Sequence, residues 1–147
     1  MERVKRLILI ALLLGAGLPM AADECPMPRN PVKVNLACGK VYGPRGKLIS
    51  GVDLQLMNKE AVAGDARADS EGKFSFGQLP VGKYMLTTHA SGWQLAWPVE
   101  ITAATATDAS ENGASHKGCK DPLKVKLSMG LSTCESSVDK KGYRARF

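Results

Sequence analysis

The chain has few aromatic residues and few groups that carry out chemistry. Only 5% of its 147 residues are Phe, Trp or Tyr, and it has two histidines, His89 and His116. No His-x-x-Glu and no Gly-x-Ser-x-Gly motif occurs. The sequence therefore offers neither the zinc ligands of a metallopeptidase nor the nucleophile turn of a serine hydrolase. It predicts no catalytic residues, no cofactor and a protein that is not an enzyme.

Basic charge is not spread along the chain, although the net charge is +6. From Asp23 to His116 there are nine basic and ten acidic residues, whereas from Lys117 to Phe147 there are eight and three. A nucleic-acid-binding domain carries a basic stripe or face, so no nucleic-acid partner is expected. The basic end, residues 131–147, is predicted to be a solvated tail that makes at most peripheral contact with anionic surfaces.

Only one long apolar run occurs, the twelve residues from Leu7 to Leu18. It is shorter than the roughly 18 to 20 residues that span a bilayer as a helix. Three basic residues precede it within residues 3–6, and Pro-Met-Ala-Ala follows at 19–22. This order is typical of a secretory signal peptide. Residues 1–22 are predicted to be a cleaved leader helix of a secreted or periplasmic protein, of a size typical of bacteria.

All four cysteines follow this leader, at Cys25, Cys38, Cys119 and Cys134. An even number of cysteines in an exported chain predicts two structural disulfides. The spacings of 13, 81 and 15 residues contain no Cys-x-x-Cys pair, so no zinc site and no other metal site is predicted. From the residues alone, three pairings remain open.

Between residues 39 and 129, short segments of alternating apolar and polar residues are separated by turn signals about ten residues apart. Segments 52–56 and 123–127 show the alternation most clearly, with lysines on the polar side of the second. This pattern predicts an all-β sandwich or barrel. The nineteen residues from 103 to 121 are small and polar, and they predict a long mobile loop.

Two motifs follow one another in the middle of the chain. Asp-Ser-Glu-Gly-Lys-Phe-Ser-Phe occupies residues 69–76, and Leu-Pro-Val-Gly-Lys-Tyr occupies 79–84. With Gly-Lys-Val-Tyr-Gly at 39–43 and Ser-Gly-Trp at 91–93, this order resembles the carboxypeptidase regulatory-like domain over residues 38 to 129. The resemblance implies a seven-stranded transthyretin-like (prealbumin-like) or immunoglobulin-like β-sandwich of the carbohydrate-binding-like group. Such domains are mostly appended modules for folding, recognition or attachment, and they perform no chemistry.

The resemblance also assigns roles to single residues. Gly72 and Gly82 are expected to take a positive φ in the two turns, and Tyr84 to bury its ring and return its hydroxyl to the backbone. In the resembled fold the first and last strands run parallel and adjacent. This implies a Cys38–Cys119 disulfide and leaves Cys25 to pair with Cys134.

Two groups of residues could form binding sites, but each also has a simpler structural role. Trp93, Trp97 and Tyr84 are the rings that a carbohydrate-binding module could stack on a sugar. Their alternation places them on the face that a sandwich buries, unless the register shifts at Pro98 and brings Trp97 out. A cluster of acidic residues around one turn predicts turn formation rather than a calcium site; it consists of Asp65, Asp69 and Glu71.

The sequence thus divides into a signal peptide (1–22), an N-terminal extension (23–37), a regulatory-like β-sandwich (38–130) and a basic tail (131–147). The predicted function is that of an exported, non-catalytic module with a binding or structural accessory role in the cell envelope or outside the cell. The alternative is a carbohydrate-binding module. The expected partner of the chain is an envelope protein in the first case and a carbohydrate in the second.

Overall fold

A computed structural model describes residues 26–89, 92–102, 119–129 and 136–147, and no helix occurs among these residues. None of their elements is a helix long and apolar enough to cross a membrane. The expected leader helix at 1–22 and nearly all of the expected loop at 103–121 lie outside the described residues.

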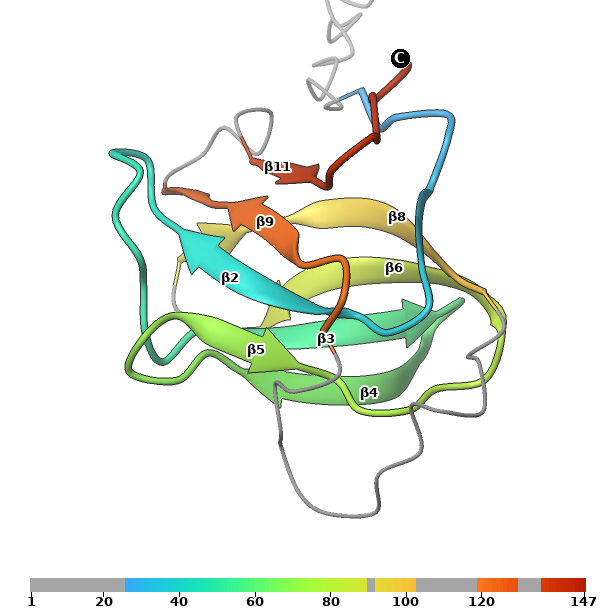
Figure 1. The fold of residues 1–147 in the computed structure, drawn as a ribbon, viewed down its shortest axis with the longest axis horizontal. Coiled ribbons are helices and arrows are strands. Elements are labelled where there is room, and N and C mark those ends of the chain that lie inside the picture. Colours follow the sequence, from blue (N-terminus) through green and yellow to red (C-terminus); the bar gives the residue numbers. More distant parts are fainter. Residues whose placement is uncertain (1–25, 90–91, 103–118, 130–135) are drawn as a thin grey trace, which may run out of the picture.

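Two β-sheets pack face to face in the described part of the chain (Figure 1). Its eleven strands are β1 (Val32–Val34), β2 (Cys38–Tyr42), β3 (Asp53–Asn58), β4 (Ala61–Arg67), β5 (Lys73–Ser75), β6 (Gly82–His89), β7 (Trp93–Gln94), β8 (Ala96–Ile101), β9 (Leu123–Lys126), β10 (Ser128–Met129) and β11 (Ser137–Asp139). One sheet has the order β1-β8-β6-β3-β4 and the other β11-β9-β2-β5. Strand pairs β1–β8 and β2–β9 are parallel, and all other pairs are antiparallel.

Alternation of side chains builds the core between the sheets. In β3, Leu54 and Leu56 are fully buried, while Gln55 between them is partly exposed. In β9, Leu123 and Val125 are fully buried, and the intervening lysines face solvent. Because neighbouring side chains of a strand leave on opposite faces, this pattern gives each sheet one apolar face, as predicted.

A short ribbon links the two sheets at one edge. Strand β7 precedes β8 in one sheet, β10 follows β9 in the other, and β7 pairs with β10. The residues at the two junctions, Leu95 and Leu127, are both buried. The ribbon therefore joins the two sheets through the segments that precede β8 and follow β9.

The strand count differs from the seven that were expected. Strand β4 went unrecognised because it has no apolar alternation: it is an outer strand of its sheet with mostly exposed Ala, Gly and charged side chains. Strands β1 and β11 have three residues each, and they depend on pairing with β8 and β9. The all-β prediction is confirmed.

The two turn glycines behave differently. Gly72 has a φ of +70°, as expected, and an added Cβ would lie 3.2 Å from the carbonyl oxygens of Ile49 and Val41. Gly82 does not have a positive φ, so that prediction is wrong; the positive φ before β6 belongs to Gly77. The chain thus turns before the Leu-Pro segment and is already extended at Gly82, the first residue of β6.

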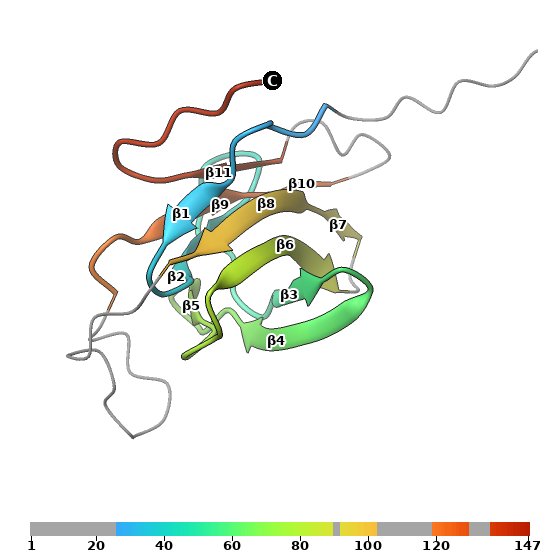
Figure 2. The same ribbon diagram turned by 90° about the vertical axis from the view of Figure 1, so that its right-hand side faces the viewer.

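The end of the chain was expected to be a solvated tail beyond residue 130. Instead, β11 pairs with β9 and extends the four-stranded sheet. After it, residues 140–147 run back beside the N-terminal residues 26–31 (Figure 2). Both segments, although placed outside the predicted sandwich boundaries, are therefore parts of the folded unit.

Candidate functional site

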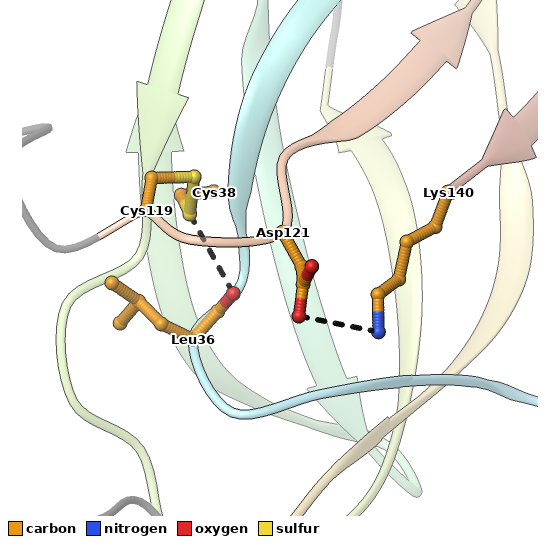
Figure 3. The surroundings of a disulfide bond; sticks show 5 residues. All are labelled: Leu36, Cys38, Cys119, Asp121 and Lys140. Carbon is orange, nitrogen blue, oxygen red and sulfur yellow. Dashed lines mark hydrogen bonds and ion pairs between the residues drawn. A yellow bond between two sulfur atoms is a disulfide. The ribbon is translucent and has the colours of Figure 1, made fainter. Parts of the chain in front are cut away.

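The disulfide is the first predicted feature that the structure places. Cys38 begins β2 and Cys119 precedes β9, and their Cα atoms are 5.9 Å apart. Figure 3 shows the bond beside Leu36, whose carbonyl oxygen lies 3.6 Å from the Cys38 sulfur. Because a disulfide sulfur carries no proton, this is a contact and not a hydrogen bond. The pairing implied by the resemblance is confirmed, whereas Cys25 and Cys134 lie outside the described residues.

The aromatic residues proposed for sugar binding belong mainly to the core. Trp97 and Tyr84 are each only 6% exposed. The Tyr84 hydroxyl donates a hydrogen bond to the Pro80 carbonyl (2.7 Å), which confirms its expected return to the backbone. Of the three rings, only Trp93 is more than marginally exposed, and it also packs against the core. Stacking on a sugar needs an open ring face, so Trp97 and Tyr84 provide no such platform.

Of the three acidic residues predicted to form the turn before β5, Asp69 and Glu71 belong to it, whereas Asp65 lies in strand β4. Asp69 accepts hydrogen bonds from the backbone N–H groups of Glu71 (2.8 Å) and Lys73 (2.9 Å). Glu71 pairs with the Lys73 ammonium, which raises the pKa of that lysine. Asp65 accepts from Gln55 on the neighbouring strand. Within the described residues, no group of three His, Cys, Asp or Glu side chains could hold a metal ion.

Two serines form a buried hydroxyl pair that the sequence reasoning missed. Ser136 Oγ accepts from the Ser128 backbone N–H (2.9 Å), lies 3.1 Å from Ser128 Oγ and donates to the Gln94 carbonyl (2.5 Å). These bonds join the β7–β10 ribbon to the chain before β11. The hydroxyls are thus used to hold the fold. The side chain of His89 and all of His116 lie outside the described residues.

A basic groove of about 630 Å³ lies between the two ends of the chain. One wall is formed by Asn30, Pro31 and Lys33, and the other by residues 140–144 and Arg146. We call it the basic groove because five of its lining side chains are basic: Lys33, Lys140, Lys141, Arg144 and Arg146. None of its lining residues is acidic.

Asn30 holds the two walls together. Its side-chain amide donates to the Arg144 carbonyl (2.9 Å) and accepts from the Arg146 backbone N–H (2.8 Å), while its own carbonyl accepts from the Tyr143 hydroxyl (3.0 Å). The Arg29 N–H adds a backbone bond to the Arg146 carbonyl (2.6 Å). The walls are therefore fixed through their backbones, and the arginine side chains remain available.

The five charges of the groove fall into two groups. Lys33 lies 3.9 Å from Glu100, and Lys140 lies 3.8 Å from Asp121, the pair drawn in Figure 3. Lys140 also donates to the Lys33 carbonyl (2.7 Å). The other three, Lys141, Arg144 and Arg146, are exposed, and no carboxylate of the described residues forms an ion pair with them.

Beneath the groove, alternate residues of the last segment face the core. Tyr143 and Ala145 pack against the core, and the ring of Phe147 meets Trp97 edge-on. Burial raises the pKa of Tyr143; the nearby Trp97 indole opposes this shift, and Asp139 adds to it. The Trp97 Nε1 is buried, and in the described part of the chain it forms no hydrogen bond. The alternation of apolar and basic residues over 143–147 was the one sequence signal that could have revealed this wall.

The comparisons with known proteins agree with the fold. Residues 38–112, half of the chain, match the family described as carboxypeptidase regulatory-like domain. No match was found among curated proteins or among solved structures. The matched residues include β2 to β8, and the two-sheet arrangement is that of a β-sandwich. The chain belongs to the carboxypeptidase regulatory-like domain family.

Proposed function

We propose that this chain is an exported, non-catalytic accessory module that acts in the cell envelope or outside the cell. The disulfide between Cys38 and Cys119 carries the proposal, because such bonds persist in oxidising compartments and are rare in the cytosol. The order of basic, apolar and small residues over 1–22 supports export independently.

A non-catalytic role is supported by the family and by the chemistry available. The chain has two histidines and no nucleophile motif. The buried hydroxyls of Ser128 and Ser136 bond to each other and to the Gln94 carbonyl, so they serve packing. The basic groove, by contrast, has walls fixed by hydrogen bonds and exposed cations, which suits binding.

Export can be tested by fractionating cells that express the full chain and determining the N-terminus of the product. We expect it outside the cytoplasm, without residues 1–22, and with Cys38 and Cys119 resistant to thiol alkylation until reduced. Recovery in the cytosol with free thiols would contradict export. A Cys38→Ala/Cys119→Ala variant reports whether the bond is needed for accumulation.

The non-catalytic role needs a separate assay. The purified protein is assayed with peptide esters and with purine-derived ring substrates, and we expect no turnover above background. Turnover that disappears in His89→Ala or His116→Ala would show that the module is an enzyme. This result would leave the export proposal intact.

A further inference from the structure

The basic groove has the features of a site for an anionic membrane surface. We infer that Lys141, Arg144 and Arg146 dock this protein onto phosphate-bearing lipid headgroups. The inference rests on the proposed export only for the identity of the membrane; binding itself is a property of the folded chain.

The first argument is that some cations of the groove have ion-pair partners and others do not. Lys33 and Lys140 have carboxylate partners within 4 Å, and the Lys140 ammonium also bonds to a backbone carbonyl. Glu100 and Asp121 offset part of this positive charge, although the Lys33 side chain is itself 67% exposed. Lys141, Arg144 and Arg146 are different, since within the described residues they have no ion-pair partner. A negatively charged partner would supply the counter-charge that the described residues do not provide for these three side chains.

The spacing of the two arginines is the second argument. Arg144 and Arg146 are exposed, whereas Tyr143 and Ala145 pack against the core, so both arginines leave the chain on the solvent side. Side chains two residues apart along an extended chain are separated by about 6.6 Å. The planar guanidinium binds phosphate oxygens with paired hydrogen bonds. Two such groups held side by side suit a surface that presents many phosphates.

Exposed apolar residues at one end of the groove favour a membrane over a soluble polymer. The two walls run antiparallel, because Lys33 lies by Lys140 and Arg29 by Arg146 (Figure 2). This order places Met27, which is 53% exposed, at the same end as Phe147, which is 63% exposed. Apolar side chains beside a cluster of bases are typical of segments that lie in the headgroup layer. An acidic polysaccharide would gain little from covering them.

The test is flotation of the purified full chain with vesicles of phosphatidylcholine alone and of equal parts phosphatidylcholine and phosphatidylglycerol. Each basic residue near an anionic membrane strengthens partitioning roughly fivefold. We expect binding to the anionic vesicles to exceed binding to the neutral ones by about a hundredfold, and to fall as salt is added. Binding to neutral vesicles measures any contribution of the apolar run at 7–18.

A matched pair of triple variants separates the groove from net charge. Lys141→Gln/Arg144→Gln/Arg146→Gln removes the three cations of the groove that have no ion-pair partner among the described residues. Its control, Arg45→Gln/Lys47→Gln/Lys83→Gln, removes the same charge from exposed residues that do not line the groove. We expect the first to lose about a hundredfold in anionic binding and the control to lose less than fivefold. Equal losses would overturn the inference.

Three further measurements distinguish membrane binding from misfolding, from free-anion binding and from glycan binding. Circular dichroism and urea unfolding must show that both triple variants fold, and Phe147→Ser should weaken anionic binding several-fold in a chain with all its cations. Vesicle binding is also measured with added inorganic phosphate and with chloride at the same ionic strength. If phosphate abolishes binding and chloride does not, the groove is a site for free anions and not for a membrane. Retention on an acidic polysaccharide matrix without vesicle binding would replace the membrane by a glycan. If the protein does not bind anionic vesicles at all, the membrane-docking inference is wrong, but the export proposal is unaffected.

Discussion

The ring of Phe147 meets the indole of Trp97 edge-on, with centroids 6.4 Å apart and an interplanar angle of 84°. Trp97 belongs to β8 in the five-stranded sheet, and Phe147 ends the sequence. The contact therefore fixes the segment that forms one wall of the basic groove to the core of the sandwich. Trp97 itself belongs to the buried core and is only 6% exposed.

Removal of the Phe147 ring should have a small and measurable cost. We expect Phe147→Ala to lower the free energy of unfolding by about 0.5–1 kcal/mol, the lower part of the range for aromatic pairs, because the ring is largely exposed. Urea unfolding followed by tryptophan fluorescence measures this loss. Val81→Ala is the control, since Val81 is similarly exposed. Equal costs in the two variants would mean that the ring contact contributes nothing.

The Cys38–Cys119 disulfide should contribute much of the stability. The cysteines are 81 residues apart, and closing a loop of this length stabilises the fold by about 4.5 kcal/mol in the chain-entropy treatment. This is a large share of the roughly 5–15 kcal/mol of an ordinary domain. We expect Cys38→Ala/Cys119→Ala to lower the urea midpoint accordingly. An unchanged midpoint would show that parallel pairing of β2 with β9 is enough to hold the sheet.

Gly39 should tolerate no side chain. A Cβ at this position would lie 2.0 Å from the carbonyl oxygen of Leu123, so β2 and β9 would have to separate. We expect Gly39→Ala to cost at least about 3 kcal/mol, above the usual range for overpacking because the obstacle is backbone. Gly64→Ala is the control: its Cβ would meet only side-chain atoms at ordinary distances, Leu79 at 3.4 Å and Phe76 at 3.5 Å. A stable Gly39→Ala protein would contradict the observed closeness of the two strands.

The Tyr84 hydroxyl should be worth about one ordinary hydrogen bond. Tyr84→Phe leaves the ring in place and deprives the Pro80 carbonyl of its donor. We expect a loss of about 1 kcal/mol in the free energy of unfolding. Tyr42→Phe serves as the control, because within the described residues its hydroxyl forms no hydrogen bond. A loss in both variants would indicate a general effect of the hydroxyl.

Much of the sandwich could be predicted because its signals are local. The alternation around Leu54 and around Val125 fixes which faces are buried, and the buried Tyr84 follows from one motif. Strand β4 was missed because an outer strand with exposed alanines has no apolar period to detect. The basic groove was missed because Asn30 and Arg144 are 114 residues apart, and a bond of such separation leaves no local pattern.

Tyr143 should make stability depend on alkaline pH. Burial raises the pKa of its hydroxyl above the ordinary value of 10.0, since the charged phenolate is poorly solvated beneath the groove. As the pH rises through 10, the unfolded chain loses this proton first, while the folded chain keeps it. The contribution is therefore complete below pH 10 and is lost as the pH rises through the raised pKa of the folded state.

Urea midpoints measured from neutral to alkaline pH in the wild type and in Tyr143→Phe isolate this effect, because all other titrating groups are common to both. We expect the wild-type midpoint to fall more steeply above pH 10. At neutral pH, Tyr143→Phe should be less stable by about 1 kcal/mol, because the Asn30 carbonyl loses its donor. That offset does not change the slope. Parallel curves at alkaline pH would show that Tyr143 titrates in the folded chain as it does in the unfolded one, and hence that its packing against the core does not shield the hydroxyl from solvent.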